Sequence, residues 1–392
     1  MKLRYFSVIF SCSMGLTLAA RDIHVNVERG SDQGDGSRSA PYRNINFAIA
    51  KAVPGDVVKI LPASVPINYG LSLKDIAGEP GCPIVIDGHF NIIEGAVRIE
   101  PKEWQLISPE TGLYKFTGKL PTFRTTASYR QRHYMIFDGR TERMNRSSKF
   151  EVSKQTFKAP GQLGNYEWTI FNDREFYFKL PPGKPISDAD IRIPELMNGV
   201  RLTGNCKHVV IRNLIVRHVW NDSYNIHGNC RDIVFEKIAS LYSGDDGVSA
   251  HGTCQVAINT AYLYGGGTGF GHVGEAEVAH KNIYVGGSVG LDIFLNNTRN
   301  SLENIYLDGE SKGGISLRNQ LVPFRECYFL NRRKEMVSLA TRNLVTIPEK
   351  VSICNYKLSG STELQGQFIE KLDPAIIDTA KDKIKAVFRG KL

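Results

Sequence analysis

Apolar residues in the middle of the chain recur in short runs, and glycine, asparagine and aspartate separate each run from the next. Three successive segments repeat this pattern at a spacing of 24 residues, and each carries a cysteine at the same place, Cys206, Cys230 and Cys254. They read VRLTGNCKHVVIRNLIV, YNIHGNCRDIVFEKIAS and VSAHGTCQVAINTAYLY. A fixed period of this length is typical of stacked repeats, in which each unit buries its apolar face against its neighbours.

The repeat continues beyond these segments with a slightly variable step of 21 to 24 residues. Coils are expected to start near Gly199, Ser223, Gly247, Gly269, Gly290 and Gly313. A second apolar ladder comprises Leu214, Ile238, Tyr262, Ile283, Ile305 and Cys327. The leucine-rich repeat consensus is absent, and propeller blades need longer units. The sequence therefore predicts an all-β fold, a right-handed parallel β-helix with coils of 21–24 residues.

Five regions are expected along the chain. Residues 1–20 have a basic start, an apolar run too short for a membrane span of about 20 residues, and small residues at the end, as in a secretory signal peptide. Residues 21–100 are expected to form an N-terminal cap, with a helix over 45–53, and the first coils. Residues 101–195 alternate aromatic and polar positions, which predicts an inserted antiparallel β-module. The main β-helix follows over 196–372, and 373–392 form an amphipathic C-terminal helical cap.

Charge and cysteine content narrow the class of protein. The signal peptide predicts secretion, extracellular or periplasmic, and six cysteines remain after its removal. The three periodic cysteines are expected to be buried thiols, although a bridge between neighbouring rungs is geometrically conceivable. The net charge is +9, and residues 121–160 hold nine Lys or Arg against three acids. We expect a monomer that attracts an acidic polysaccharide, with no nucleic-acid partner and no membrane span.

The same 24-residue step places polar side chains beside one another, with Asp222 against Asp246 and His227 against His251. Side chains alternate between the two faces of a strand, which gives two outward rows. One row holds Arg201, Asn225, Ser249, Gly271 and Asp292. The other holds Thr203, His227, His251, Val273 and Phe294. Aspartates also favour turns, but carboxylates stacked at about 5 Å repel each other unless a cation or a shared proton relieves them.

Two chemistries would use such a patch. In inverting glycoside hydrolysis, one carboxylic acid protonates the leaving oxygen and a carboxylate activates water; Asp222, Asp245 and Asp246 offer these groups. In β-elimination from a uronic acid, the same carboxylates would hold Ca²⁺, and a histidine, lysine or arginine would remove the proton. His272 falls in the histidine row if counted 21 residues from His251, and turns inward if Gly269 is aligned with Gly290.

Three segments carry a resemblance to known enzymes: DSYNIHG (222–228), GDDGVSAHG (244–252) and GTGFGHVG (267–274). They resemble consecutive coils of the pectate-lyase-like superfamily of β-helix carbohydrate enzymes. Polygalacturonases have counterparts to Asn221-Asp222 and Gly244-Asp245-Asp246, but their histidine is missing at 267–269 and their Arg-Ile-Lys near 291–293. Calcium-dependent pectate lyases match the three aspartates, but their lysine position is Gly271. The N-terminal segment and the FYFKLPPG run are also similar to parts of such enzymes.

These observations predict a secreted enzyme that hydrolyses glycosidic bonds of an acidic polysaccharide without a cofactor. The predicted catalytic residues are Asp222, Asp245, Asp246 and His251. The predicted substrate-binding residues are Arg201, Asn225, His227, His272 and Asp292. One alternative is a lyase in which Asp222, Asp245 and Asp246 bind Ca²⁺. Another is a carbohydrate-binding or surface-structural β-helix without catalytic activity.

Overall fold

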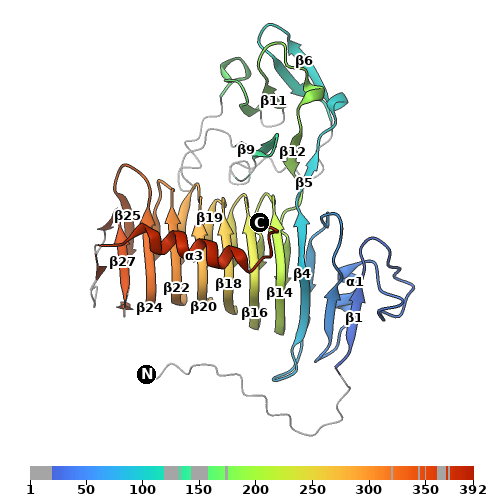
Figure 1. The fold of residues 1–392 in the computed structure, drawn as a ribbon, viewed down its shortest axis with the longest axis vertical. Helices are drawn as coiled ribbons and strands as arrows, with labels where there is room; N and C mark the ends of the chain where they lie inside the picture. The colour runs from blue at the N-terminus through green and yellow to red at the C-terminus, as the bar shows by residue number, and fades with distance from the viewer. Residues whose placement is uncertain are drawn as a thin grey trace.

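Two long parallel sheets run along the molecule and enclose its core (Figure 1). The computed structural model describes residues 20–118, 132, 134–142, 158–172, 175–318, 321–342, 345–348, 350–359, 368–369 and 371–392. The signal-peptide prediction therefore falls, apart from Ala20, outside the described residues, as does most of the basic stretch 121–160. The predicted fold class, a parallel β-helix with small antiparallel sheets, is confirmed.

The first sheet contains the long strands. In chain order, its strands are β1 (Asp22–Val25), β2 (Val57–Ile60), β4 (Ile84–Glu94), β14 (Lys207–Arg217), β16 (Arg231–Leu241), β18 (Gln255–Tyr264), β20 (Glu277–Gly286), β22 (Arg299–Gly309), β24 (Leu321–Asn331), β26 (Val345–Pro348), β27 (Val351–Cys354) and β29 (Phe368–Ile369). Neighbouring strands pair in parallel, so consecutive coils stack directly on one another. These coils follow the period read from the sequence.

The second sheet is formed by shorter strands, one from each coil. They are β3 (Leu71–Lys74), β13 (Val200–Thr203), β15 (Tyr224–Ile226), β17 (Asp246–Ala250), β19 (Thr268–Val273), β21 (Leu291–Asn296), β23 (Ile315–Arg318), β25 (Val337–Arg342) and β28 (Tyr356–Ser359). The turn that leads from each long strand to the next short strand lies at one edge of the solenoid. The candidate acids lie in these turns.

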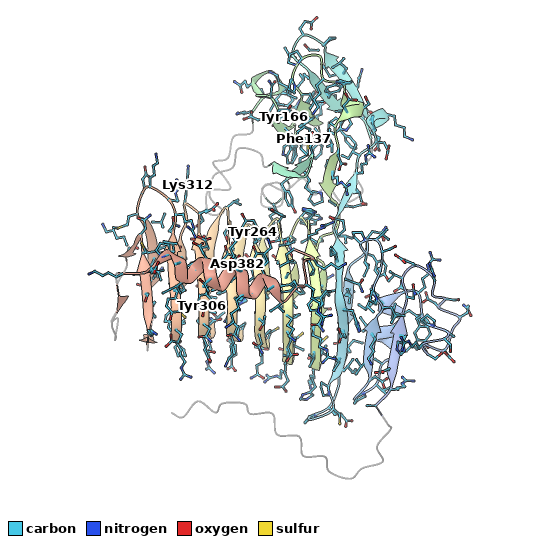
Figure 2. The ribbon with its side chains drawn as sticks, in the orientation of Figure 1. Phe137, Tyr166, Tyr264, Tyr306, Lys312 and Asp382 are labelled. Atoms are coloured by element: carbon cyan, nitrogen blue, oxygen red, sulfur yellow. The ribbon has the colours of Figure 1, made fainter. Side chains whose placement is uncertain are left out.

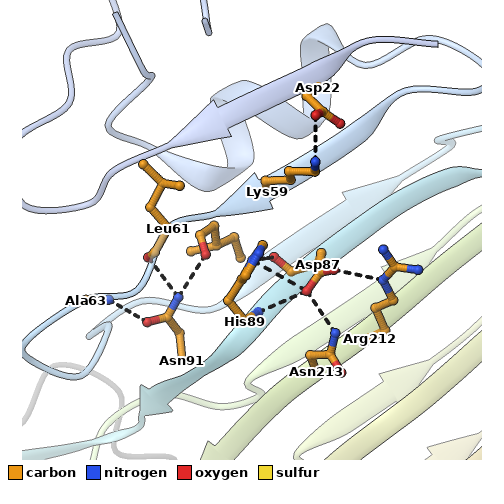
Figure 3. A network of polar contacts seen from close by, with 10 residues as sticks. Asp22, Lys59, Leu61, Ala63, Asp87, His89, Asn91, Arg212 and Asn213 are labelled. Carbon is orange, nitrogen blue, oxygen red and sulfur yellow. Dashed lines mark hydrogen bonds and ion pairs between the residues drawn. The ribbon is translucent and has the colours of Figure 1, made fainter. Parts of the chain in front are cut away.

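Six consecutive long strands, β14 to β24, bend at a left-handed residue that occupies the same level in every coil. The bend positions with positive φ are Asn213, Lys237, Thr260, Asn282, Asn304 and Glu326. Asparagine is suited to these positions because it tolerates the left-handed conformation and its side chain can hydrogen-bond to the asparagine of the neighbouring coil. Asn304 Nδ2, for example, donates to Asn282 Oδ1 at 3.0 Å. In β4 the bend lies at His89 and Phe90, where Asp87 accepts from the His89 amide and from Asn213 (Figure 3).

The core is an apolar column between the sheets. Cys206, Cys230 and Cys254 are fully buried within it as free thiols, as predicted. At the N-terminal end, helix α1 (Ile45–Lys51) places Ile45, Ala48 and Ile49 on this column. The Asn44 side chain caps the helix by accepting from the Phe47 amide.

Residues between β4 and β13 form a module with its own core. They contain β5 (Ala96–Arg98), η1 (Pro101–Glu103), β6 (Trp104–Ser108), β7 (Leu113–Phe116), β8 (Met135–Phe137), β9 (Arg140–Glu142), η3 (Pro160–Gln162), β10 (Trp168–Phe171), β11 (Glu175–Lys179), η4 (Ile186–Asp188) and β12 (Ile191–Pro194). These strands form two antiparallel sheets, and aromatic rings such as Phe137 and Tyr166 meet between them (Figure 2). Because β4 pairs directly with β14, the module is an insertion between adjacent coils. It stands at the edge where the long strands end (Figure 1).

The C-terminal helix α3 (Pro374–Ala386) forms where the sequence predicts a helix. However, it lies across the outer face of the long strands instead of over the end of the solenoid (Figure 1). Its buried residues Ile377 and Ile384 pack against a row of tyrosines that includes Tyr262 and Tyr284. No helix among the described residues is long and apolar enough to cross a membrane.

Two details of the predicted register are wrong. Ile238 pairs with Ala261, so Tyr262 belongs to the outer face and not to the core ladder. Phe270 pairs with Ile293, and Gly271 therefore lies beside Phe294 and not beside Asp292. The second error arises at a turn, because residues 265–267 join β18 to β19 whereas 287–290 join β20 to β21. Aligning Gly269 with Gly290 gives a step of 21 residues, whereas the observed step from Phe270 to Ile293 is 23.

Candidate active site

Three aspartates meet at the turns that precede β15 and β17. The Asp246 amide donates to Asp222 Oδ1 at 3.0 Å, and the Asp245 amide donates to the Asn221 carbonyl at 3.1 Å. One carboxylate oxygen from each of the three aspartates lies within 4.8 Å of the others. Their side chains are buried, with 3%, 5% and 5% of Asp222, Asp245 and Asp246 exposed. The neighbours expected from the 24-residue step are therefore neighbours in space.

The inserted module contributes a residue that was missed as a specific candidate in the sequence. Arg132 Nη2 lies 2.7 Å from Asp245 Oδ2, and its Nη1 donates to the Asn221 side chain. A side chain at Gly244 would collide with the Arg132 carbonyl, so glycine permits this close approach. The basic stretch 121–160 was the available signal, but it does not indicate which arginine reaches the acids.

Asp222 has a strongly shifted pKa. Its Oδ2 accepts from Asn221 Nδ2 at 3.0 Å and from Asn225. Burial, with the negative charges of Asp246 and Asp245, raises the pKa of Asp222 to about 8, although Arg132 acts in the opposite direction. Asp222 is therefore mostly protonated at neutral pH. Asn225, predicted to bind sugar, lies beside the cluster and is itself largely buried.

Asp246 is held by Ser249 of its own strand β17 and by Gly271 of the next coil. Ser249 Oγ lies 2.9 Å from Asp246 Oδ2 and 2.9 Å from His251 Nε2. His251, predicted to be catalytic, thus reaches the acids through Ser249. A Cβ at Gly271 would lie 2.5 Å from Asp246 Oδ2, so the carboxylate occupies the space of the missing side chain.

The outer face beside the acids carries Arg201 and two histidines. The rings of His227 and His251 stack at 4.0 Å with an angle of 9°, and Arg201 pairs in register with Asn225. Desolvation of the His227 ring, with the charges of His251 and Arg201, lowers the pKa of His227 to about 4. Arg201 and His227 are exposed, and His251 is half-buried.

Of the two orientations that the sequence left open for His272, the structure shows the inward one, so its predicted substrate-binding side chain does not reach the outer face. This side chain is fully buried in the core, because Ala250 and His272 are paired on adjacent strands and both face inward. The Ala250 amide donates to His272 Nδ1 at 3.1 Å, and His272 Nε2 lies 2.9 Å from His280 Nε2. His280 Nδ1 in turn lies 3.1 Å from the Ser301 carbonyl. Burial lowers the pKa of both rings, that of His280 to about 4.

The predicted outward placement of Asp292 is wrong. Its side chain is fully buried, and Tyr356 donates a hydrogen bond of 2.8 Å to Oδ2. Burial raises the pKa of Asp292 to about 7. Because the register differs by the length of one turn, this acid lies apart from the row that contains Asn225 and Ser249.

The three aspartates have the donor chemistry of a calcium site, because carboxylate oxygens are the ligands that this hard cation prefers. Elsewhere in the described part of the chain, no other group of three His, Cys, Asp or Glu side chains gathers in this way. Arg132 already supplies one positive charge to Asp245. A cation bound by the three oxygens would therefore share Asp245 with a guanidinium.

Comparison with known proteins supports the fold. No protein-family model and no curated protein matches the sequence. Among solved structures, the chain is similar to XylC in its complex with xylose, with a TM-score of 0.53 and 13% identity over 90% of this chain and 71% of XylC. It is also similar to a glycoside hydrolase (TM-score 0.47, 10% identity, 92% and 98% covered) and to pectate lyase Pel9A (0.38, 10%, 84% and 77%). At these identities the likeness shows the fold alone, a parallel β-helix.

Proposed function

We propose that this chain is a carbohydrate-active enzyme that hydrolyses glycosidic bonds at the Asp222, Asp245 and Asp246 cluster. The observation that carries the proposal is the difference between two adjacent carboxyl groups. Asp222 has a pKa of about 8, whereas Asp245 forms an ion pair with Arg132. Titratable groups whose environments separate their protonation states are suited to general acid and base roles.

In the proposed reaction, the Asp222 carboxylic acid donates its proton to the oxygen of the leaving sugar. A second carboxylate, from Asp245 or Asp246, attacks the anomeric carbon or activates water. Carboxyl groups of retaining enzymes are about 5–5.5 Å apart and those of most inverting enzymes about 6.5–9.5 Å apart. Oxygens within 4.8 Å favour the retaining arrangement over the inverting one considered from the sequence. The anomeric configuration of the first product, measured by NMR, tests this choice.

The substrate that we propose is an acidic polysaccharide outside the cytoplasm. Arg201 and His227 are exposed next to the acids, and the chain has a net charge of +9, so a uronate carboxylate would find cationic partners. The likeness to a structure solved with xylose is consistent with a sugar ligand. The predicted signal peptide would deliver the enzyme to such a substrate.

Incubation of the protein with a panel of neutral, uronic-acid and sulfated polysaccharides tests the proposal. Hydrolysis releases reducing ends without ultraviolet-absorbing unsaturated uronates. Unsaturated products would refute hydrolysis and identify a lyase. Binding to a glycan without any cleavage would favour the non-catalytic alternative, in which the acids have a structural role.

A calcium-dependent lyase is the second candidate, because three buried carboxylate oxygens within 4.8 Å fit a hard cation. Asp222, Asp245 and Asp246 would hold the ion, which would neutralise the uronate carboxylate. His251 or His227 would have to remove the proton, since Gly271 provides no side chain. Loss of activity with a chelator and its return with Ca²⁺ would support this candidate over hydrolysis.

A further inference from the structure

We infer that Gly271 and Ser249 are positioning residues that orient the Asp246 carboxylate toward Asp222 and Asp245. The inference rests on the proposed function and extends it to the neighbouring coil. Ser249 and Gly271 are partners in the parallel pairing of β17 with β19, so they contact Asp246 from adjacent positions on the outer face.

Gly271 acts by leaving space. A Cβ at this position would lie 2.5 Å from Asp246 Oδ2 and 2.7 Å from its Cγ, closer than non-bonded carbon and oxygen atoms approach. The backbone at Gly271 is not in the left-handed region, unlike that of Gly274. Glycine is therefore needed here for room and not for backbone conformation. Any larger residue displaces the carboxylate.

Ser249 acts by a hydrogen bond to the same oxygen. Its hydroxyl lies 2.9 Å from Asp246 Oδ2, 3.1 Å from the Gly271 carbonyl and 2.9 Å from His251 Nε2. Ser249 is buried, so water does not compete for these bonds. His251 can donate to the hydroxyl, and the hydroxyl proton then has two acceptors, Asp246 Oδ2 and the Gly271 carbonyl, of which the charged carboxylate is the stronger and the closer. Gly271 and Ser249 together limit the carboxylate to one orientation.

This arrangement also bears on the type of reaction. The side chain of Asp246 fills the space that a residue at position 271 would otherwise occupy. The site therefore places an acid where β19 could have supplied a base. A base that removes a proton here would therefore come from another position, such as His251 or His227.

The test compares Gly271→Ala and Ser249→Ala with Gly161→Ala. Gly161 lies in the inserted module, where an added Cβ meets no atom within 4 Å, so its variant is a matched control. Displacing a catalytic group by about 1 Å lowers rates about hundredfold. We expect Gly271→Ala and Ser249→Ala to lower kcat by about that factor with little change in KM, and Gly161→Ala to keep the wild-type rate. Thermal unfolding verifies that all three variants are folded.

A double-mutant cycle separates positioning from a general structural effect. In an Asp246→Asn background, the Gly271→Ala and Ser249→Ala changes should reduce the residual rate no further, because their target is already absent. Wild-type kcat in Gly271→Ala, or an equal additional loss in the Asp246→Asn background, overturns the inference.

Crystal structures provide a readout that does not depend on activity. In Gly271→Ala the Asp246 carboxylate should move away from position 271, and in Gly161→Ala it should stay in place. A carboxylate that keeps its place in Gly271→Ala overturns the inference even if the wild-type enzyme is active. Absence of glycan cleavage by the wild-type protein refutes the proposed function instead, and the carboxylate position then decides the inference alone.

Discussion

One pair of histidines lies on the outer surface of the second sheet, and another pair lies in the core between the two sheets. His227 and His251 stack on the outer face beside the candidate acids, whereas His272 and His280 bond to each other inside the core. Both pairs contain a ring whose pKa is lowered to about 4. A lowered pKa therefore does not by itself identify a functional histidine, and the side of the strand on which the ring lies is the better guide.

Two buried aspartates show the same contrast. Burial raises the pKa of both Asp222 and Asp292, to about 8 and about 7. Asp292 is bonded to Tyr356 within the solenoid. Asp222 lies against two more carboxylates and close to Arg132. Neighbouring charges, and not burial alone, distinguish a candidate catalytic acid from a structural one.

The largest effect is expected when these two aspartates are substituted separately, because only Asp222 is proposed to act in catalysis. Asp222→Asn removes the proton donor, and general acid catalysis contributes about 10²–10⁴-fold, so we expect kcat for glycan cleavage to fall by about a thousandfold. Asp292→Asn keeps the shape of a side chain that contacts no candidate site residue and should retain the wild-type rate within a few fold. Equal losses in both variants would show that the acids have the same structural role.

The next effect concerns Arg132, which lowers the pKa of Asp222. In Arg132→Ala that pKa should rise above about 8 by roughly one unit. Because Asp222 must be protonated to act as an acid, the alkaline limb of the pH–rate profile should move to higher pH, with kcat about tenfold lower at neutral pH. Arg201→Ala is the control, since Arg201 is exposed on the same face; it should alter KM and leave the limb unmoved. An unchanged alkaline limb in Arg132→Ala would show that this arginine does not influence the pKa of Asp222.

The smallest effect concerns stability below neutral pH. His272 and His280 have pKa values lowered from 6.5 in the folded state, that of His280 to about 4. The unfolded chain therefore binds more protons below pH 6.5, and stability falls as pH decreases from about 6.5 to about 4, by up to about 1 kcal/mol per pH unit for each ring. Urea unfolding between these pH values should show a smaller slope in His280→Gln than in the wild type. His227→Gln should change the slope less, because water screens an exposed ring. A larger change of slope in His227→Gln than in His280→Gln would contradict this assignment of buried and exposed rings.

Much of the fold could be predicted because it depends on local pattern. The period of the cysteines identifies the coils from β13 to β18, and the aromatic alternation identifies the inserted module. Prediction failed where a turn changed length. The step from Gly271 to its partner Phe294 is 23 residues, two more than the 21 that placed Asp292 in this row. The apolar pattern does not reveal such a change, because the turn 287–290 consists of glycine, serine and the exposed Val289.

The candidate site was predictable to the same extent. The meeting of Asp222 and Asp246, and the stack of His227 on His251, follow from a constant 24-residue step. The contact of Arg132 with Asp245 could not be predicted from the repeat. These residues lie more than a hundred positions apart, and the inserted module does not share the period of the coils. The need for glycine at position 271 could not be predicted from the sequence either, since it depends on the orientation of the Asp246 side chain.

The sequence by itself determined the stacking of the coils, the buried cysteine column and the acids that become neighbours, since hydrophobic burial repeats with the period of the chain. Only the tertiary structure decided which polar groups face outward. It turned His272 and Asp292 into the interior, brought Arg132 to Asp245, and placed Asp246 over Gly271. The physical reason is that local turn lengths and long-range packing, which no repeat encodes, set the side on which each side chain lies and the charges that surround it.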